Sequence, residues 1–224
     1  DAEKRFMRFD VFVSLYAGVP ILEITHVLGV NDVAQSEFLA FSALDIPIEL
    51  GNGNEINRAY ALTEDGQQCP LPMQGRLFQC EDDQFEIVDD QQTVRNSGIR
   101  SDGILVADTN TGQVFLAISE FWQQFPKGIE IRENGFDVEL FPKLDALGAG
   151  RYTNRDDEHI WYYYLRDDVY TIRQGVEKSH LFYIGFGEED GVSCNDEVPT
   201  SFQVQPVALP DFDYLAETEA AGAL

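Results

Sequence analysis

Short apolar segments alternate with turn signals along this chain, and that pattern restricts it to an all-β fold. In FDVFVSLYA the apolar residues Phe9, Val11, Val13 and Leu15 recur at every second position, the period of a strand with one buried face. Comparable segments follow as ILEITHVLGV, FLAFSALDIPIEL, GILVAD, QVFLAIS, HLFYIGF and SFQVQPVAL. Many short strands at such spacing predict a large antiparallel β-sandwich with very little helix.

The turns between these segments predict particular hairpins. Asp108–Gly112 (DTNTG) separates GILVAD from QVFLAIS, and Asn134-Gly135 divides IEIRENGFDVELF. An Asn-Gly pair between apolar strands is among the strongest short-range hairpin signals. The best candidate for a short helix is Ser119–Phe125, where Ser119 would cap the first turn and Pro126 would end the helix.

The sequence shows no internal repeat and no mid-chain linker, so residues 1–210 are predicted to form a single sandwich domain. Residues 211–224 are rich in Ala and Glu and lack an apolar face, which predicts a linker toward a following domain. Hydrophobic residues make up 44% of the chain, with 16 Phe and 9 Tyr, enough for a sizeable core. No apolar run is long enough to span a bilayer, so no membrane role is expected.

The charge excludes one class of partner. Forty acidic residues against 15 Lys and Arg give a net charge of −25. A surface of this sign repels the phosphate backbone, so nucleic acid is not an expected partner. A strongly acidic surface is typical of secreted or salt-adapted proteins, and we expect a secreted or periplasmic location.

Neither the cysteines nor the acidic loops predict a cofactor. Cys69 and Cys80 flank the loop CPLPMQGRLFQC, where they could form a disulfide or remain buried free thiols, and Cys194 is left over in either case. Their spacing fits no zinc site. DTNTG and EEDGVSCNDE offer oxygen ligands for calcium but lack EF-hand spacing, so solvated turns are favoured and no metal site is predicted.

A set of longer segments resembles one enzyme family. They are AISEFWQQFPKGIEI (117–131), then GFDVELFP and RQGVEKSHLFYIGF (173–186), with SLYAGVPILEITHVL near the start and PDFDYLAETEAAGAL at the end. Their types and their order resemble the central part of the exo-rhamnogalacturonan lyase (PcRGLX/YetA-like) family.

That resemblance implies a β-sandwich of the galactose-mutarotase-like supersandwich type, flanked in the same polypeptide by a barrel and an α/α toroid. It also implies a polysaccharide lyase that cleaves uronic-acid-containing, pectic glycans by β-elimination, with this domain supporting or edging the active-site cleft. The expected partners are a polysaccharide and the neighbouring domains, and the isolated chain is expected to be inactive. A stand-alone carbohydrate-binding module and a structural spacer remain as alternatives.

β-Elimination needs a base, a cation that neutralises the uronate carboxylate, and an acid for the leaving oxygen. The best local constellation is Arg173, Lys178 and His180. Lys178 and His180 are two residues apart and share one face of the predicted strand. The ammonium would lower the pKa of the imidazole and favour a neutral base. A structural role for His180 is the alternative, and His26, within an apolar strand, is interpreted as structural.

Two segments offer residues for substrate binding. In FWQQFPK, Trp122 could stack on a sugar, Gln123 could bind hydroxyls and Lys127 could bind a carboxylate, or the segment could pack against a neighbouring domain. In IWYYYL, Trp161 and Tyr163 share one face and could form an aromatic platform. A core and interface role is the alternative for that cluster.

Overall fold

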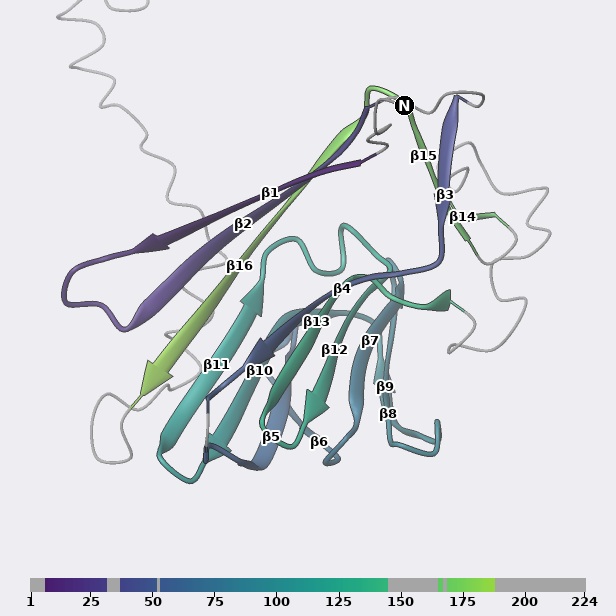
Figure 1. The fold of residues 1–224 in the computed structure, drawn as a ribbon. Coiled ribbons are helices and arrows are strands. Elements are labelled where there is room, and N and C mark those ends of the chain that lie inside the picture. Colours follow the sequence, from purple (N-terminus) through teal and green to yellow (C-terminus); the bar gives the residue numbers. More distant parts are fainter. Residues whose placement is uncertain (1–6, 32–36, 52, 145–164, 167–168, 188–224) are drawn as a thin grey trace, which may run out of the picture.

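The structure is a computed structural model that describes residues 7–31, 37–51, 53–144, 165–166 and 169–187 (Figure 1). The predicted strand SFQVQPVAL, the tail 211–224 and Cys194 lie outside these residues. The predicted domain boundary at residue 210 therefore stays a prediction.

The first sheet has seven strands in the order β1-β2-β16-β11-β10-β5-β6, and all neighbours are antiparallel. Its strands are β1 (Met7–Leu15), β2 (Ile21–Val30), β16 (Glu177–Gly187), β11 (Gly112–Ile118), β10 (Ser101–Thr109), β5 (Ile56–Thr63) and β6 (Gln68–Leu71). The N-terminal strands β1 and β2 therefore lie next to the last described strand, β16, which in turn pairs with β11 from the middle of the chain.

The second sheet has six antiparallel strands in the order β4-β13-β12-β7-β8-β9. They are β4 (Leu44–Glu49), β13 (Gly135–Phe141), β12 (Lys127–Arg132), β7 (Arg76–Glu81), β8 (Gln84–Val88) and β9 (Val94–Gly98). A small third sheet, β14-β15-β3, consists of β14 (Leu165–Arg166), β15 (Val169–Arg173) and β3 (Phe38–Phe41).

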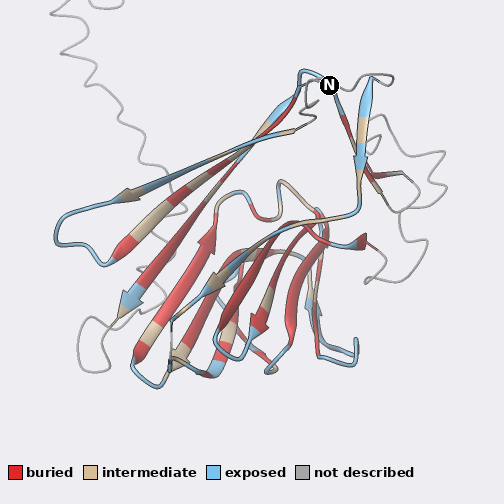
Figure 2. Cartoon of the chain, viewed as in Figure 1, coloured by how far each residue is buried: buried red, intermediate tan, exposed pale blue. Residues whose placement is uncertain are grey.

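The main core lies between the two large sheets (Figure 2). Leu105 and Leu116 of the seven-stranded sheet pack with Leu77, Ile129 and Val138 of the six-stranded sheet, and all five are fully buried. Alternating apolar residues on facing strands produce this packing, as in other sandwiches. The predicted all-β antiparallel sandwich is confirmed.

Both predicted hairpins are present, one of them with a shifted turn. β10 and β11 close through Thr109 paired with Gly112. In the other, Arg132 pairs with Gly135, so the two-residue loop is Glu133-Asn134 rather than the predicted Asn134-Gly135. The reason is close packing, because a Cβ on Gly135 would lie 1.9 Å from the carbonyl oxygen of Ile48 on β4. Gly135 is needed at the strand start and not in the turn.

The helix predicted over Ser119–Phe125 is wrong. These residues form turns, with one helix-like bond from the N–H of Gln124 to the carbonyl of Glu120 at 2.9 Å. Glu120 has a φ of 54°, which no α-helix accommodates. The next residue, Phe121, is 1% exposed and packs where Gly103 leaves room, since a Cβ there would lie 2.3 Å from the Cβ of Phe121. Tertiary packing of Phe121 overrides the local helix signal.

The sandwich is not closed along β1. The predicted apolar face of this strand exists, but Phe9, Val11 and Val13 are 48%, 56% and 56% exposed. Figure 1 shows β1, β2 and β16 extending away from the remaining strands. The apolar groove between these strands and β4 has a volume of about 450 Å³ and is lined by Phe9, Val11, Val13, Ile24, His26, Leu44, Ile46, Ile48 and Phe182.

Cys69 on β6 and Cys80 on β7 are both buried and are not bridged to each other. Of the two alternatives left open by the sequence, the structure therefore has the unbridged one. Burial raises the pKa of the Cys69 thiol, which makes it a poor nucleophile.

Candidate functional site

Three of the predicted site residues converge on the ring of Phe141. The ammonium nitrogens of Lys127 and Lys178 lie 5.2 Å and 5.0 Å from the ring centroid. His180 approaches the same ring edge-to-face, with centroids 5.4 Å apart. Lys127 also donates a hydrogen bond of 2.7 Å to the carbonyl of Leu140. We call these residues, together with His26, the basic cluster.

Burial governs the protonation of the basic cluster. It lowers the pKa of Lys127 well below its usual range and that of Lys178 to about 8. Burial also lowers the pKa of His180, with smaller contributions from both lysines and from His26. The Nδ1 atoms of His26 and His180 are 3.4 Å apart, so one of the two neutral rings donates to the other. Burial thus favours the neutral form of the His180 imidazole, and the lysine charges named in the sequence prediction are the smaller cause.

Most of the basic cluster is buried, although Lys178 is half-buried and His26 lines the apolar groove. Lys127 is 1% exposed and His180 is 3% exposed. The Nε2 atom of His180 is buried and lacks a hydrogen-bond partner among the described residues. The roles predicted for His180, Lys178 and Lys127 in catalysis and binding stay predictions.

The other predicted residues lie elsewhere or outside the described part. Arg173 is on β15 of the small sheet, with its guanidinium 3.6 Å from exposed Glu37. Trp122 and Gln123 belong to the turn before β12, and the guanidinium of Arg100 lies 3.9 Å above the Trp122 ring, so one face of the ring is already covered. Trp161 and Tyr163 are outside the described residues.

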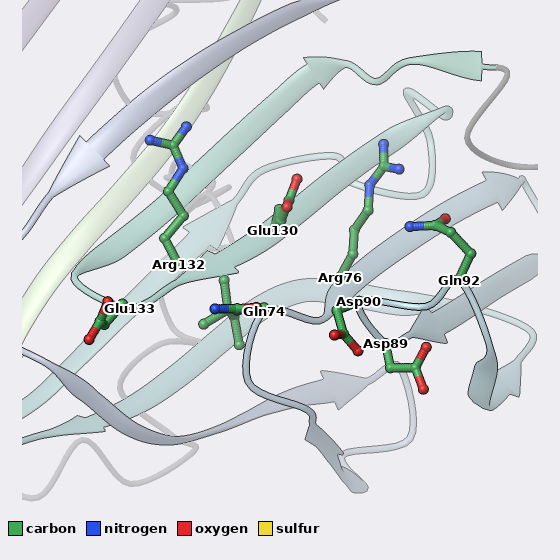
Figure 3. Close-up of a pocket in the computed structure, with 9 residues that line it drawn as sticks. Gln74, Arg76, Asp89, Asp90, Gln92, Glu130, Arg132 and Glu133 are labelled. Atoms are coloured by element: carbon green, nitrogen blue, oxygen red, sulfur yellow. The ribbon is translucent and has the colours of Figure 1, made fainter.

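A second constellation, made of residues outside the predicted site, lies at one end of the six-stranded sheet (Figure 3). We call this cavity of about 340 Å³ the polar pocket. Figure 3 shows the side chains of Arg76, Glu130 and Arg132 extending in the same direction. The pocket is lined by Gln74, Arg76, Asp89, Asp90, Gln92, Glu130, Ile131, Arg132 and Glu133.

Arg76, which lines the polar pocket, forms a buried ion pair with Glu139, which lies behind the lining. The Nε atom of Arg76 donates to Glu139 at 2.5 Å, and both side chains are 7% exposed. Gly128, between them on β12, provides the space, because a Cβ there would lie 2.0 Å from the Oε2 atom of Glu139. Removing either partner of such a pair leaves an uncompensated buried charge, which strongly destabilises the fold.

The strand register concentrates carboxylates around this pair. Glu130 is directly opposite Asp137 on β13, and Glu139 is opposite Asp45 on β4. Like charges at such positions repel, and the arginines offset this repulsion. Burial raises the pKa of Glu139 to about 7, with Asp45 and Glu130 adding to the rise and Arg76 opposing it. Glu139 therefore titrates near neutral pH.

The two arginines differ in how much of their hydrogen-bonding capacity is used. Arg132 makes a two-point ion pair with Asp137. Arg76 uses Nε on Glu139, but its Nη2 atom is buried and has no hydrogen-bond partner among the described residues. An unsatisfied buried donor costs free energy, and because this atom is itself buried, a ligand in the pocket does not reach it in this arrangement.

Two turns frame the polar pocket. The backbone of Gln74 and of Gln92 is left-handed, with φ of 57° and 60°, unusual for residues with a Cβ. In the β8–β9 turn, Asp89 accepts hydrogen bonds from the backbone N–H groups of Gln91 and Thr93 and pairs with Arg95. These bonds fix the loop that presents Asp90 and Gln92.

Part of this site has a signal in the sequence. In GIEIRENGFDVEL the charged residues Glu130, Arg132, Asp137 and Glu139 alternate with the apolar core residues, which predicts a charged strand face. Arg76 is 63 positions away from Glu139, and no local pattern indicates that the two meet.

Within the described ranges, no cluster of three or more His, Cys, Asp or Glu side chains has the arrangement of a metal site. No helix in that part of the chain is long and apolar enough to cross a membrane.

Comparison with known proteins gives only weak likenesses to solved structures. No family model and no curated protein matches the chain. A crystal structure from Escherichia coli K12, of a protein provisionally assigned as an aldose 1-epimerase, aligns with a TM-score of 0.40 at 12% identity. The alignment covers 81% of this chain, which spans 60% of the length of that protein. The assignment as an antiparallel sandwich rests on the strand order and core described above, and the lyase family stays a prediction.

Proposed function

We propose that this chain is a carbohydrate-binding sandwich domain and that the polar pocket is its sugar site. The observation that carries the proposal is the polar lining of the pocket, where the guanidinium of Arg132, 45% exposed, lies near the amides of Gln74 and Gln92. Sugars present oxygen acceptors at fixed spacing, and a rigid guanidinium is suited to bind them.

The rest of the lining supports a sugar ligand. Gln74 and Gln92 supply amide groups that both donate and accept, and Asp90 and Glu133 supply acceptors for hydroxyl protons. Small-molecule sites are concave and contain a few convergent polar groups, and a volume of about 340 Å³ is enough for one or two sugar rings.

The finer proposal is that the domain belongs to a polysaccharide lyase acting on uronic-acid-containing, rhamnogalacturonan-like glycans. Its support is the set of ordered segments that resemble that family, together with a pocket that contains the cation Arg132 and adjoins Glu139, a buried carboxyl whose pKa is raised to about 7. These are two of the three groups that β-elimination requires. In this proposal the domain is secreted or periplasmic and edges a cleft that neighbouring domains complete.

Calorimetric titration with short galacturonate and galactose oligosaccharides tests the sugar site. We expect binding that falls about tenfold or more in Arg132→Gln, because a charged hydrogen bond contributes roughly 1.5–3 kcal/mol. Arg58→Gln is the matched control, since Arg58 is an exposed arginine paired with Asp108 on the other sheet. Absence of binding to both sugars, or equal losses in the two variants, refutes the proposal.

The lyase proposal has a separate test. Incubation with pectic glycans, followed by ultraviolet absorbance of the unsaturated uronate product, is run on this chain and on a chain extended at both ends. If only the extended chain is active, this domain acts as a non-catalytic support in the lyase. Turnover at ordinary enzyme rates by this chain alone contradicts that role, and no product from either chain contradicts the reaction class.

A further inference from the structure

Strand β1 is a long sheet edge without the features that usually protect one. The strands at the ends of the two large sheets are β1, β6, β4 and β9. β4 and β6 contain Pro47 and Pro70, and β9 is short, polar and interrupted by a bulge. Such features keep a sheet edge from pairing with other chains. β1 has nine residues, contains no proline and pairs with β2 without a register shift.

The backbone groups on the outer edge of β1 belong to every second residue. On the far side of β2, the N–H of Val30 donates to Val176 at 3.0 Å, and its carbonyl accepts from Gly175 at 2.8 Å. Because hydrogen bonding alternates along antiparallel pairs, Met7, which is opposite Val30, turns its backbone groups outward. The outward-facing residues are therefore Met7, Phe9, Val11, Val13 and Leu15. Within the described ranges, no backbone hydrogen bond engages this outer edge.

The side chains of β1 are uncovered as well (Figure 2). Phe9, Val11 and Val13 face the apolar groove and are about half exposed, and Phe12 on the opposite face is 59% exposed. An apolar strand with an unpaired edge is typical of sites that receive another strand. The free edge offers backbone donors and acceptors at regular spacing, so the matching partner is an extended polypeptide segment.

The charges of β1 fit a second copy of the same strand. In a chain of net charge −25, β1 carries one cation, Arg8, and one anion, Asp10, two positions apart. Both side chains are partly exposed and lie 2.8 Å apart. If two copies of β1 pair antiparallel about Phe9, each Arg8 lies opposite the second copy's Asp10. Two opposite-charge pairs then offset the repulsion that this net charge imposes on contacts between copies.

We propose that two copies of this chain associate through antiparallel pairing of their β1 strands, centred on Phe9. The two seven-stranded sheets then join across a two-fold axis, and Met7 exchanges backbone hydrogen bonds with the second copy's Val11. The two Phe9 side chains lie side by side on the face that lines the groove. Association depends on protein concentration, and the dilute monomer keeps β1 as an open edge.

Sedimentation velocity of the full chain, from micromolar to millimolar concentration, measures this association. We expect a monomer that converts to a dimer and to nothing larger, because a two-fold contact closes on itself. Val11→Pro removes an outward N–H but leaves the bonds between β1 and β2, so it should weaken dimerisation about tenfold or more. A monomer at every concentration, open-ended assembly, or an unchanged dimer in Val11→Pro overturns the inference.

Charge variants keep the test decisive even if the proline variant fails to fold. Asp10→Arg places Arg8 opposite a second cation in both symmetric pairs and should weaken dimerisation about tenfold. Adding Arg8→Asp restores opposite charges across the contact and should restore the dimer. Asp83→Arg, at an exposed turn between β7 and β8, makes the same change in net charge and should leave the dimer in place.

A double variant that stays monomeric, or an equal loss of dimer in Asp83→Arg, also overturns the pairing of β1 strands. β1 does not line the polar pocket, so dimerisation and sugar binding succeed or fail separately.

Discussion

Replacing Glu139 by Gln should change how the stability of the domain depends on pH. The substitution keeps the size and the hydrogen-bond acceptor for Arg76 but removes the titration. The pKa of Glu139 rises from 4.5 to about 7 on folding, mainly because the carboxyl is buried. The folded state therefore binds this proton more tightly than the unfolded state.

The sign and the magnitude follow from linkage. A raised carboxyl pKa contributes stability that is fully present below pH 4.5 and is lost as pH rises through about 7. A difference of this size corresponds to about 3 kcal/mol at roughly 1.4 kcal/mol per pKa unit. Between pH 4.5 and pH 8.5 the wild-type protein should lose that amount through Glu139, whereas Glu139→Gln should not.

Urea unfolding monitored by intrinsic fluorescence, at several pH values across this window, measures the effect. The informative quantity is the difference in unfolding free energy between variant and wild type, which should shift by about 3 kcal/mol in favour of the variant as pH rises. Glu55→Gln, at an exposed position, should run parallel to wild type. If Glu139→Gln also runs parallel, the reasoning about a buried titrating carboxyl is refuted.

Three further predictions concern stability. Gly128→Ala should cost about 1–3 kcal/mol in urea unfolding because the added methyl overlaps the Glu139 carboxylate. Gly29→Ala, where a Cβ has only ordinary contacts at 3.7–3.8 Å, should cost little, and equal losses in the two variants would contradict the space argument. Burial lowers the pKa of Lys178 to about 8, so this residue should make the unfolding free energy rise by up to about 3 kcal/mol between pH 8 and 10.5. Lys178→Met should remove that contribution. If the variant's unfolding free energy rises with pH as steeply as that of wild type, the amine is not desolvated. Val138→Thr should lower the unfolding free energy by about 2 kcal/mol or more, but Val11→Thr by under about 1 kcal/mol, because only Val138 is fully buried. Comparable losses in the two variants would mean that the apolar face of β1 is also buried.

The sequence predicts those features that local pattern determines. Alternating apolar residues specify the strands, and period two places Lys178 and His180 on one face, where the structure also has them. The sequence also singles out Lys127, but its approach to the same ring depends on the pairing of β12 with β13 in one sheet and on the position of β16 in the other. That arrangement arises from tertiary structure, which no local spacing encodes.

The incorrect or missing predictions have the same physical origin. The turn of the second hairpin shifts by one residue because β4 approaches Gly135 closely. The predicted helix fails because burial of Phe121 outweighs a cap and a few helix formers. The Arg76–Glu139 pair joins strands that are distant in sequence, and it forms only when the register of β7, β12 and β13 is set.

The exposed apolar face of β1 has a consequence for the order in which parts of the domain unfold locally. β1 is at the edge of its sheet in the described strand order, and it contacts the rest of the sheet through β2. Its inward side chains bury little surface, so opening this strand sacrifices few apolar contacts. In amide hydrogen exchange the N–H groups of β1 should therefore exchange first, well before those of β10 to β13. The domain would open from its N-terminal margin while the central strands stay protected.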